Sequence, residues 1–342
     1  MIVYIILVPL FASLIIPLLG MVNRKSSFYL ALISSLITFF LVASTIKNVL
    51  IYGKEYYWFG GFEPPFGIEY VVDGLTSILL LIISFIFLLV IIYSKKSLEK
   101  EIEEKRIALF YCILNLFFTG ILGIVITGDI FNLYVFVEIA SLSSYTLIAM
   151  GQKRQSLMAS YNYLILGTIG ATFVLIGIGY LFMATGSLNM ADIKMRLVPH
   201  YHSKMVRTAF AFLTLGLSLK LALFPLHIWL PNAYTYAPST VGALLAATGT
   251  KVSAYALIRV LYSVFTLEFD VNVIPFNKIF IFISLIAILS GSFLALSQKN
   301  LKKMLAYSSI GQIGYITLGI AMANETALQG SILHIFNHSL MK

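Results

Sequence analysis

The sequence predicts an all-α, polytopic membrane protein with about eleven transmembrane helices. Of its 342 residues, 60% are hydrophobic and 11% are charged, and the mean hydropathy is +0.95. Soluble domains of this length do not have such a composition. Apolar runs long enough, or nearly long enough, to cross about 30 Å of hydrocarbon recur along the chain. They lie at residues 2–19, 28–46, 74–93, 107–126, 130–150, 160–184, 206–229, 239–264, 278–297, 304–322 and 327–342.

The net charge of +9 would by itself suggest a nucleic-acid partner, but its distribution argues against one. In the short loops of a membrane protein, an excess of Lys and Arg sets the orientation instead. With the N-terminus outside, the inside loops near residues 24–25, 95–106, 153–154 and 299–303 hold twelve Lys and Arg, and the outside regions hold seven. We therefore expect a multi-pass protein of the cell membrane, embedded in the lipid bilayer with its N-terminus outside, and no nucleic-acid partner.

The first apolar run has no basic segment before it and no evident cleavage site, so we expect a retained helix and not a signal peptide. Cys112, the single cysteine, lies in an apolar run, which excludes disulfides within the chain and thiolate metal sites. The loop Lys47–Val72 contains Pro64 and Pro65 and is predicted to be a turn-rich cap. The loop Lys95–Arg106 alternates lysine with glutamate and is predicted to be solvated.

The last apolar run begins near Ala327 and reaches Lys342, which gives about 16 residues or roughly 24 Å of helix, short of a full span. A terminal carboxylate rarely lies at such a depth, beside a lysine and two histidines. We therefore expect the chain to be a fragment or one piece of a split protein.

The stretch Leu215–Tyr234 is predicted to be the functional centre of the chain. It begins as a membrane helix, carries Lys220 in apolar surroundings, and is then interrupted by Pro225 and Pro231. A proline inside a helix removes a backbone donor and clashes with the preceding turn. Within a bilayer such a break is tolerated only where it is buried in protein or lines a watery cavity. A buried lysine beside a broken helix indicates an ion path.

Glu138 lies in the middle of an apolar run and is the expected partner of Lys220. An isolated charge at that depth costs at least about 2.5–3.5 kcal/mol, so such residues usually face a partner or water. Moving a carboxylate toward or away from a buried lysine changes the proton affinity of both groups, which a proton relay requires. The alternative is a static salt bridge that holds two helices together.

Four further titratable residues extend this predicted relay. Lys251 lies near the centre of the next apolar run, where water would connect it to Lys220; the alternative is a lysine bound by backbone carbonyls or hydroxyls. His334, His338 and Lys342 recur every four residues and therefore share one helix face. That face is the next stretch of relay or a polar seam between helices. No metal is expected there, because no carboxylate or cysteine lies within helical reach.

Several other polar residues receive simpler interpretations. Asp73 and Asp129 lie at helix starts, where a carboxylate stabilises the helix N-terminus, so both are predicted to be caps. Arg259 lies near a helix end and is expected to extend its side chain to the membrane surface. His227, just past Pro225, either continues the relay or lies at the interface.

Five stretches resemble one known family. They are VVDGLTSILL (Val71–Leu80), FNLYVFVEIASLSSY (Phe131–Tyr145), LGLSLKLALFPLHIWLPNAY (Leu215–Tyr234), LKKMLAYSSIGQIGYI (Leu301–Ile316) and HIFNHSLMK (His334–Lys342). The chain resembles the antiporter-like subunits shared by respiratory complex I, Mrp-type cation/proton antiporters and archaeal membrane-bound hydrogenases. The segment Thr185–Ile193 is most similar to the branch of the Mrp D subunits, which includes hydrogenase-type complexes.

The resemblance implies a role for each predicted relay residue. Glu138 and Lys220 would form the glutamate–lysine pair of the first half-channel, and Lys251 would connect it to the central hydrophilic axis. His334, His338 and Lys342 match the histidine-bearing helix of the family. The family has two inverted five-helix repeats, each with a broken helix.

The resemblance also implies a division of the chain and a set of partners. Three N-terminal helices would occupy residues 1–106, the first repeat residues 107–264, and part of the second repeat residues 265–342. The second broken helix is then absent, which puts a full path across the membrane by this chain alone in doubt. The implied partners are other membrane subunits, including antiporter-like and small Mrp-type subunits.

The leading hypothesis is a subunit that translocates protons, with sodium as an alternative cation, within a respiratory or hydrogenase-type complex. Such a subunit has no redox site of its own, so we expect no cofactor. One rival is a stand-alone secondary sodium/proton antiporter. A second is a redox subunit that binds haem, quinone or an iron–sulfur cluster, although one cysteine excludes a cysteine-ligated cluster. A third, a membrane anchor, leaves the central charges unexplained.

Overall fold

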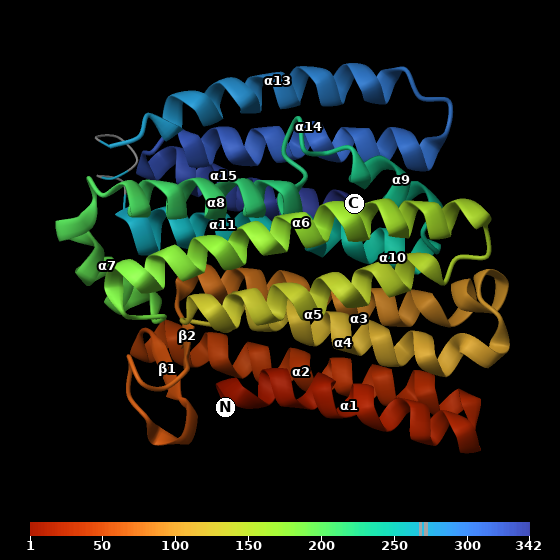
Figure 1. Cartoon of the computed structure of the whole chain (residues 1–342). Coiled ribbons are helices and arrows are strands. Elements are labelled where there is room, and N and C mark those ends of the chain that lie inside the picture. Colours follow the sequence, from red (N-terminus) through yellow and green to blue (C-terminus); the bar gives the residue numbers. More distant parts are fainter. Residues whose placement is uncertain (267–268, 270–272) are drawn as a thin grey trace.

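The computed structural model describes residues 1–266, 269 and 273–342, apart from the side chains of Val22 and Arg24. Long helices lie side by side in a bundle, and short elements close its two ends (Figure 1). Helices dominate because, in hydrocarbon, each backbone polar group must be paired within its own segment. The first six long helices are α1 (Ile2–Val22), α2 (Arg24–Tyr52), α3 (Gly74–Glu101), α4 (Ile107–Ile126), α5 (Ile130–Ala149) and α6 (Arg154–Thr185).

The second half of the bundle is less regular. One helix is divided into α8 (Lys204–Leu221) and α9 (Trp229–Tyr236). The next changes between α-helical and π-helical geometry along its length. Its segments are α10 (Ser239–Leu244), the π-helical η4 (Leu245–Gly249), α11 (Thr250–Ile258) and the π-helical η5 (Arg259–Phe265). The remaining long helices are α13 (Phe276–Leu296), α14 (Leu301–Ala321) and α15 (Glu325–Met341).

Eight helices within the described residues are long and apolar enough to cross a membrane. The other three expected runs fall on α8, α14 and α15, which are shorter or richer in polar residues. The prediction of an all-α, polytopic membrane protein is confirmed, and the count of eleven spans stays a prediction.

One end of the bundle is closed by a β-hairpin. Strands β1 (Glu55–Trp58) and β2 (Glu69–Val72) pair antiparallel, with the 3-10 turn η1 (Phe59–Gly61) between them. The expected turn-rich cap thus contains a two-stranded sheet, which the sequence did not predict because each strand is only four residues long. The Glu69 carboxylate accepts hydrogen bonds from Trp58 Nε1 at 3.0 Å and from Asn189 Nδ2 at 2.8 Å, and Asn189 caps the short helix α7 (Met190–Leu197). We call this the hairpin end.

At the opposite end, α3 continues into the predicted solvated loop as far as Glu101. Most residues of that stretch are exposed as expected, but the prediction of a loop was wrong for its first half. The loop prediction missed that Leu98 and Ile102 are buried, which anchors this end of the helix to the core. The Glu101 carboxylate then accepts hydrogen bonds of 2.6 Å from both the backbone N–H and the hydroxyl of Ser239. These bonds cap α10 and join it to the end of α3. The 3-10 turn η2 (Glu104–Arg106) leads into α4.

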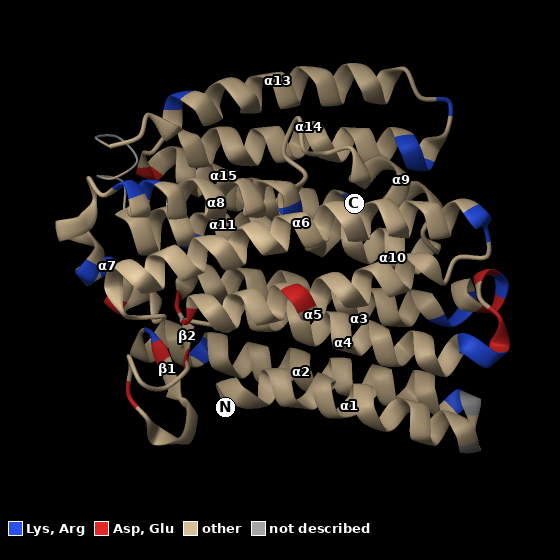
Figure 2. Ribbon diagram, viewed as in Figure 1, with Lys and Arg blue, Asp and Glu red and all other residues tan. Residues whose placement is uncertain are grey.

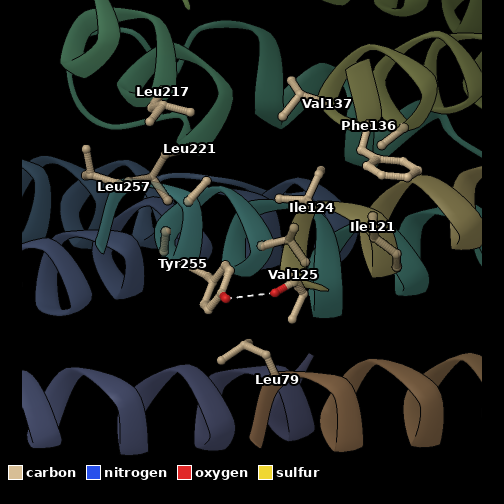
Figure 3. Packing of buried hydrophobic residues seen from close by; sticks show 14 of the residues in the cluster. Leu79, Ile121, Ile124, Val125, Phe136, Val137, Leu217, Leu221, Tyr255 and Leu257 are labelled. Carbon is tan, nitrogen blue, oxygen red and sulfur yellow. Dashed lines mark hydrogen bonds between the residues drawn. The ribbon is translucent and has the colours of Figure 1, made fainter. Parts of the chain in front are cut away.

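Charged residues gather at the two ends of the bundle and are sparse in its middle (Figure 2). The chain begins at the hairpin end, where α1 starts (Figure 1). In the interior, Phe87 of α3 stacks on Phe118 of α4 with ring centroids 3.7 Å apart. Elsewhere in the core, apolar residues of α3, α4, α5, α8 and α11 lie around Tyr255 (Figure 3). The few central charges are therefore set in a mostly apolar core.

Candidate ion-translocation site

The interruption between α8 and α9 spans residues 222–228. Ala222 adopts a left-handed conformation with φ of 60°, and Pro225 lies within the break, as predicted. Pro231 does not interrupt the chain, because it is the third residue of α9 and a helix tolerates proline in its first turn. That part of the prediction was wrong. Protein groups satisfy carbonyls at the broken end, since Trp229 Nε1 donates to Leu219 O at 3.0 Å.

Lys220 lies in the last turn of α8 and is 5% exposed. Its Nζ donates hydrogen bonds to Ser141 Oγ at 2.6 Å and to Tyr145 Oη at 3.3 Å, both on α5. Sequence reasoning missed these two partners. A signal was available, because Ser141 and Tyr145 follow Glu138 by three and seven residues and therefore lie on the same helix face.

Glu138 is half-buried on α5, one turn before Ser141. Within the described residues it forms no ion pair with Lys220, and its Oε1 has no hydrogen-bond partner there. The structure thus brings the glutamate and the lysine to one pair of helices, but the lysine contacts hydroxyl groups instead of the carboxylate. The static salt bridge considered from the sequence is not formed in this conformation.

A cavity of about 40 Å³ lies beside Lys220, and we call it the central cavity. Its lining includes Ser141 of α5 and Lys220 of α8, together with Gly249 and Ser253 of the helix that carries Lys251. A water molecule needs about 10–15 Å³ of such volume, so the cavity can hold two or three waters. It therefore links the broken helix to the helix that carries Lys251.

Lys251 is the second residue of α11 and is 1% exposed. Its Nζ donates to the backbone carbonyl of Ala246 in the preceding π-helical segment, and it does not line the central cavity. This contact matches the alternative considered from the sequence, in which backbone carbonyls bind the buried lysine. Segments of π-helix occur frequently at functional sites, because they shift side chains out of regular register.

The predicted face of α15 contains one bonded histidine and one unbonded histidine. His334 Nε2 lies 2.7 Å from Gln312 Oε1 of α14, and its ring stacks with that of His338 at a centroid distance of 6.3 Å. His338 is fully buried, and neither of its ring nitrogens has a partner in the described part of the chain. Lys342 Nζ donates to Leu305 O at 2.9 Å and to Ser308 Oγ at 3.1 Å.

A second cavity, of about 190 Å³, extends between α10, η4 and α14. Lys302 and Lys342 line it, and so does Ala246, the residue whose carbonyl binds Lys251. The arrangement therefore places polar groups in succession from Lys220, across the central cavity to α11, and on toward α14 and α15.

The two predicted caps are confirmed. Asp73 Oδ1 accepts a hydrogen bond from Thr76 N at 3.0 Å, and Asp129 Oδ1 accepts one from Asn132 N at 2.7 Å. Burial raises the pKa of Asp129 despite its hydrogen bonds from the backbone of Asn132 and Phe131. Burial would also raise the pKa of Asp73, but the neighbouring Arg259 outweighs this effect and holds it below its ordinary value.

Arg259 lies at the hairpin end of its helix, and its side chain is held in an ion pair that the sequence did not predict. Its Nη2 forms an ion pair with Asp73 Oδ1 at 2.5 Å, and both side chains are less than one-fifth exposed. His227 lies in the helix break and stacks on Phe224 at a centroid distance of 5.3 Å. Its Nδ1 is buried without a partner among the described residues. Across residues 1–266, 269 and 273–342, no group of three His, Cys, Asp or Glu side chains is arranged to hold a metal ion.

These features define a multi-pass integral membrane protein with a buried lysine at a broken helix, an arrangement typical of ion-transporting proteins. Residues 127–342 match the family described as NADH:quinone oxidoreductase/Mrp antiporter, transmembrane. The chain belongs to this family. The resemblance inferred from the five motifs is thereby confirmed.

Relatives in two kinds of complex share much of the sequence. The N subunit of the NADH-quinone oxidoreductase of Desulforudis audaxviator is 42% identical over 341 residues, which cover 99% of this chain and 67% of the relative. The D subunit of the Na(+)/H(+) antiporter of Bacillus subtilis is 31% identical over 297 residues, covering 87% of this chain and 59% of the relative. The chain thus spans roughly three-fifths to two-thirds of the length of these relatives.

Two solved structures share the fold. A chain of the membrane-bound sulfane sulfur reductase, an archaeal respiratory membrane complex, superposes with a TM-score of 0.93 at 30% identity, covering 99% of this chain and 68% of that one. A chain of the Mrp complex from Dietzia sp. superposes with a TM-score of 0.86 at 22% identity, covering 99% and 61%. The relatives are thus antiporter-like membrane subunits of multi-subunit complexes, which is consistent with ion translocation in such a complex.

Proposed function

We propose that this chain translocates protons as a subunit of a multi-subunit complex in the cell membrane. Protons move along Glu138, Lys220 and Lys251 and then along the face formed by His334, His338 and Lys342. Coupling to neighbouring subunits drives this movement. The proposal rests on the family of the chain and on two cavities within it, one lined by Lys220 and the other by Lys342.

The contact of Lys220 with Ser141 is the observation that carries the proposal. A buried ammonium group 2.6 Å from a hydroxyl, beside a cavity that can hold water, is able to pass a proton to water and recover one. Its affinity for protons depends strongly on the position of any nearby carboxylate. Glu138, one turn from Ser141 and free at Oε1 within the described residues, is placed to act as that carboxylate.

The first half-channel is proposed to comprise residues 107–264, after three helices in residues 1–106 that support it. Residues 265–342 would belong to the second repeat; five of them, 267–268 and 270–272, lie outside the described residues. The hairpin end is proposed to face the outside, because the opposite end carries more Lys and Arg in its loops. The partners are proposed to be other membrane subunits, antiporter-like and small Mrp-type subunits among them, as expected from the complexes to which the relatives belong.

Replacement of Lys220 by alanine tests the proposal. The complex is purified, reconstituted into sealed vesicles and energised by its own driving reaction, and proton movement is followed with a pH-sensitive dye. We expect Lys220→Ala to abolish translocation while the complex stays assembled. Lys204→Ala is the matched control, because Lys204 is the exposed first residue of the same helix. Normal translocation by the Lys220→Ala complex would overturn the proposal.

Sodium is the alternative cation, because the Bacillus subtilis relative is named as part of a Na(+)/H(+) antiporter. The same vesicles are prepared in sodium-free potassium buffer and compared with vesicles that contain sodium. Proton movement that is unchanged without sodium supports proton translocation. Proton movement that requires sodium, together with sodium flux in the opposite direction, supports antiport instead.

A further inference from the structure

Two cavities border the helix of Lys251 at different depths. The central cavity is lined on α11 by Val252, Ser253 and Ala256. A cavity of about 250 Å³ at the hairpin end, which we call the hairpin-side cavity, is lined by Tyr255 and Arg259 together with polar residues of the hairpin and of α7. Tyr255 and Ala256 are consecutive residues. The two cavities therefore reach this helix at neighbouring depths, from different faces.

Lys251, Tyr255 and Arg259 recur at intervals of four residues and form a polar stripe along one face of the helix. With a rise of about 1.5 Å per residue, Arg259 lies about 12 Å along the helix axis from Lys251. The stripe therefore leads from the centre of the bundle toward the hairpin-side cavity. Unless it is closed, it offers protons at Lys251 a second route.

A closed network of hydrogen bonds crosses this stripe. Arg259 Nη2 bonds to Asp73 Oδ1 at 2.5 Å and to Thr76 Oγ1 at 2.8 Å, and Arg259 Nε bonds to Tyr255 Oη at 2.8 Å. Tyr255 Oη lies 2.9 Å from Thr76 Oγ1 and donates to Val125 O at 2.7 Å (Figure 3). The single proton of the tyrosine hydroxyl is used in that bond, so Thr76 must be the donor to Tyr255.

The network ties together α3, α4, α11 and η5. Its inner members, Thr76 and Tyr255, are buried, whereas Asp73 and Arg259 line the hairpin-side cavity. Thr76 is fully buried and Tyr255 is 2% exposed. Leu79 of α3 lies below Tyr255 in Figure 3, and Ile124 of α4 lies on its other side, so apolar side chains flank the tyrosine. Both hydroxyl protons of the network are engaged, and an arginine side chain keeps its charge throughout the physiological pH range. A fixed positive charge in a narrow polar passage opposes the movement of cations, protons included.

We propose that Asp73 and Arg259, held in place by Thr76 and Tyr255, form a plug that closes the hairpin end of the proton path at Lys251. The inference rests on the proposed function, because a subunit that pumps protons must not let them pass freely between its centre and the opposite side. The plug confines protons to the route through Lys220 and the α15 face. None of its residues belongs to the relay itself.

Passive proton permeability tests the plug without the driving reaction. The intact complex is reconstituted into vesicles, a pH gradient is imposed, and its decay is followed with an entrapped dye. We expect Arg259→Gln to raise the leak about tenfold over wild type, since a modest fall in the barrier is enough. Arg259→Lys keeps the charge and should leak less than Arg259→Gln. The double variant Asp73→Asn/Arg259→Gln should leak no more than Arg259→Gln alone, because the same plug is lost in both variants.

Arg196→Gln is the matched control, because it breaks the ion pair of the exposed Arg196 with Asp192 at the same end of the molecule. It should leave the permeability unchanged. In Arg259→Gln, the further change Lys251→Ala should return the leak to the wild-type level. The proposed plug is contradicted if the assembled Arg259→Gln complex has the same proton permeability as wild type. It is also contradicted if Lys251→Ala does not lower the leak of that variant. Normal pumping by Lys220→Ala overturns the proposed function instead, so the two failures are distinguishable.

Discussion

The Nζ atom of Lys220 lies 2.6 Å from the Oγ atom of Ser141. The hydroxyl comes from α5, and the lysine is in the last turn of α8, directly before the helix breaks. Since Glu138 is one turn away on the same helix as Ser141, the serine is the nearest polar step between the two charged residues. Under the proposed function, the Ser141 hydroxyl passes protons between Glu138 and Lys220, which form no ion pair in this conformation.

Ser141→Ala should slow proton translocation by about tenfold, because Lys220 loses its closest partner and keeps only the longer bond to Tyr145. Ser143→Ala is the control, since Ser143 is also buried on α5 but donates only to Ile139 O of its own helix. Translocation is measured in sealed vesicles. Equal rates for the two variants would contradict a role for Ser141.

Gly167→Ala should disturb the site from the neighbouring helix. A Cβ atom at this position of α6 would collide with the hydroxyl of Tyr145, which is the second partner of Lys220. Overpacking of this kind costs about 1–3 kcal/mol. We expect a lower thermal unfolding midpoint of the purified complex and slower translocation. Gly179→Ala on the same helix meets nothing within 4 Å and should be neutral or slightly stabilising; similar behaviour of both variants would argue against the collision.

His338→Leu separates a relay role from a structural one. The ring nitrogens of His338 have no partner among the described residues, so removing them removes a desolvation cost of about 1–3 kcal/mol. The variant should therefore be at least as stable as wild type but should translocate protons more slowly. His334→Leu breaks the bond to Gln312 and should lower stability as well. Full translocation by a stable His338→Leu complex would remove this residue from the path.

The ion pair of Asp73 with Arg259 should stabilise the protein over a wide pH range. Because the pKa of Asp73 is lowered in the folded protein, the stabilisation is fully present above the ordinary aspartate pKa and is lost as the pH falls through the lowered value. Asp73→Asn keeps the helix cap but not the charge, and should cost about 1–3 kcal/mol at pH 7. The difference in unfolding midpoint should stay constant from pH 7 to about pH 5 and shrink below about pH 4. A difference that already vanishes at pH 6 would refute this assignment.

Composition and local motifs predicted most of the helices, because a long apolar run in a membrane has few alternatives to a helix. They did not predict the two strands, because four residues are too few to show a clear alternation of apolar and polar residues. They also failed where α3 extends to Glu101, since alternating lysine and glutamate looked solvated although Leu98 and Ile102 anchor that end of the helix to the core.

The site was predicted as a set of charges but not as a network. Lys220, Glu138 and Lys251 were found because a buried charge in an apolar run is conspicuous. Their partners were not found, because serine and tyrosine are common in helices and carry no such signal. The same holds for the partner of Arg259, since Asp73 lies 186 residues away in sequence and only the fold brings them together. The π-helical segments on either side of α11 have no sequence signature of their own.

The most direct test of the central claim is proton translocation by Glu138→Gln, Lys220→Ala and the double variant, each in sealed vesicles of the assembled complex. If the two residues act as one unit, each single change should already abolish translocation, and the double variant should be no worse. Translocation near the wild-type rate in either single variant, or losses that simply multiply in the double variant, would contradict the account.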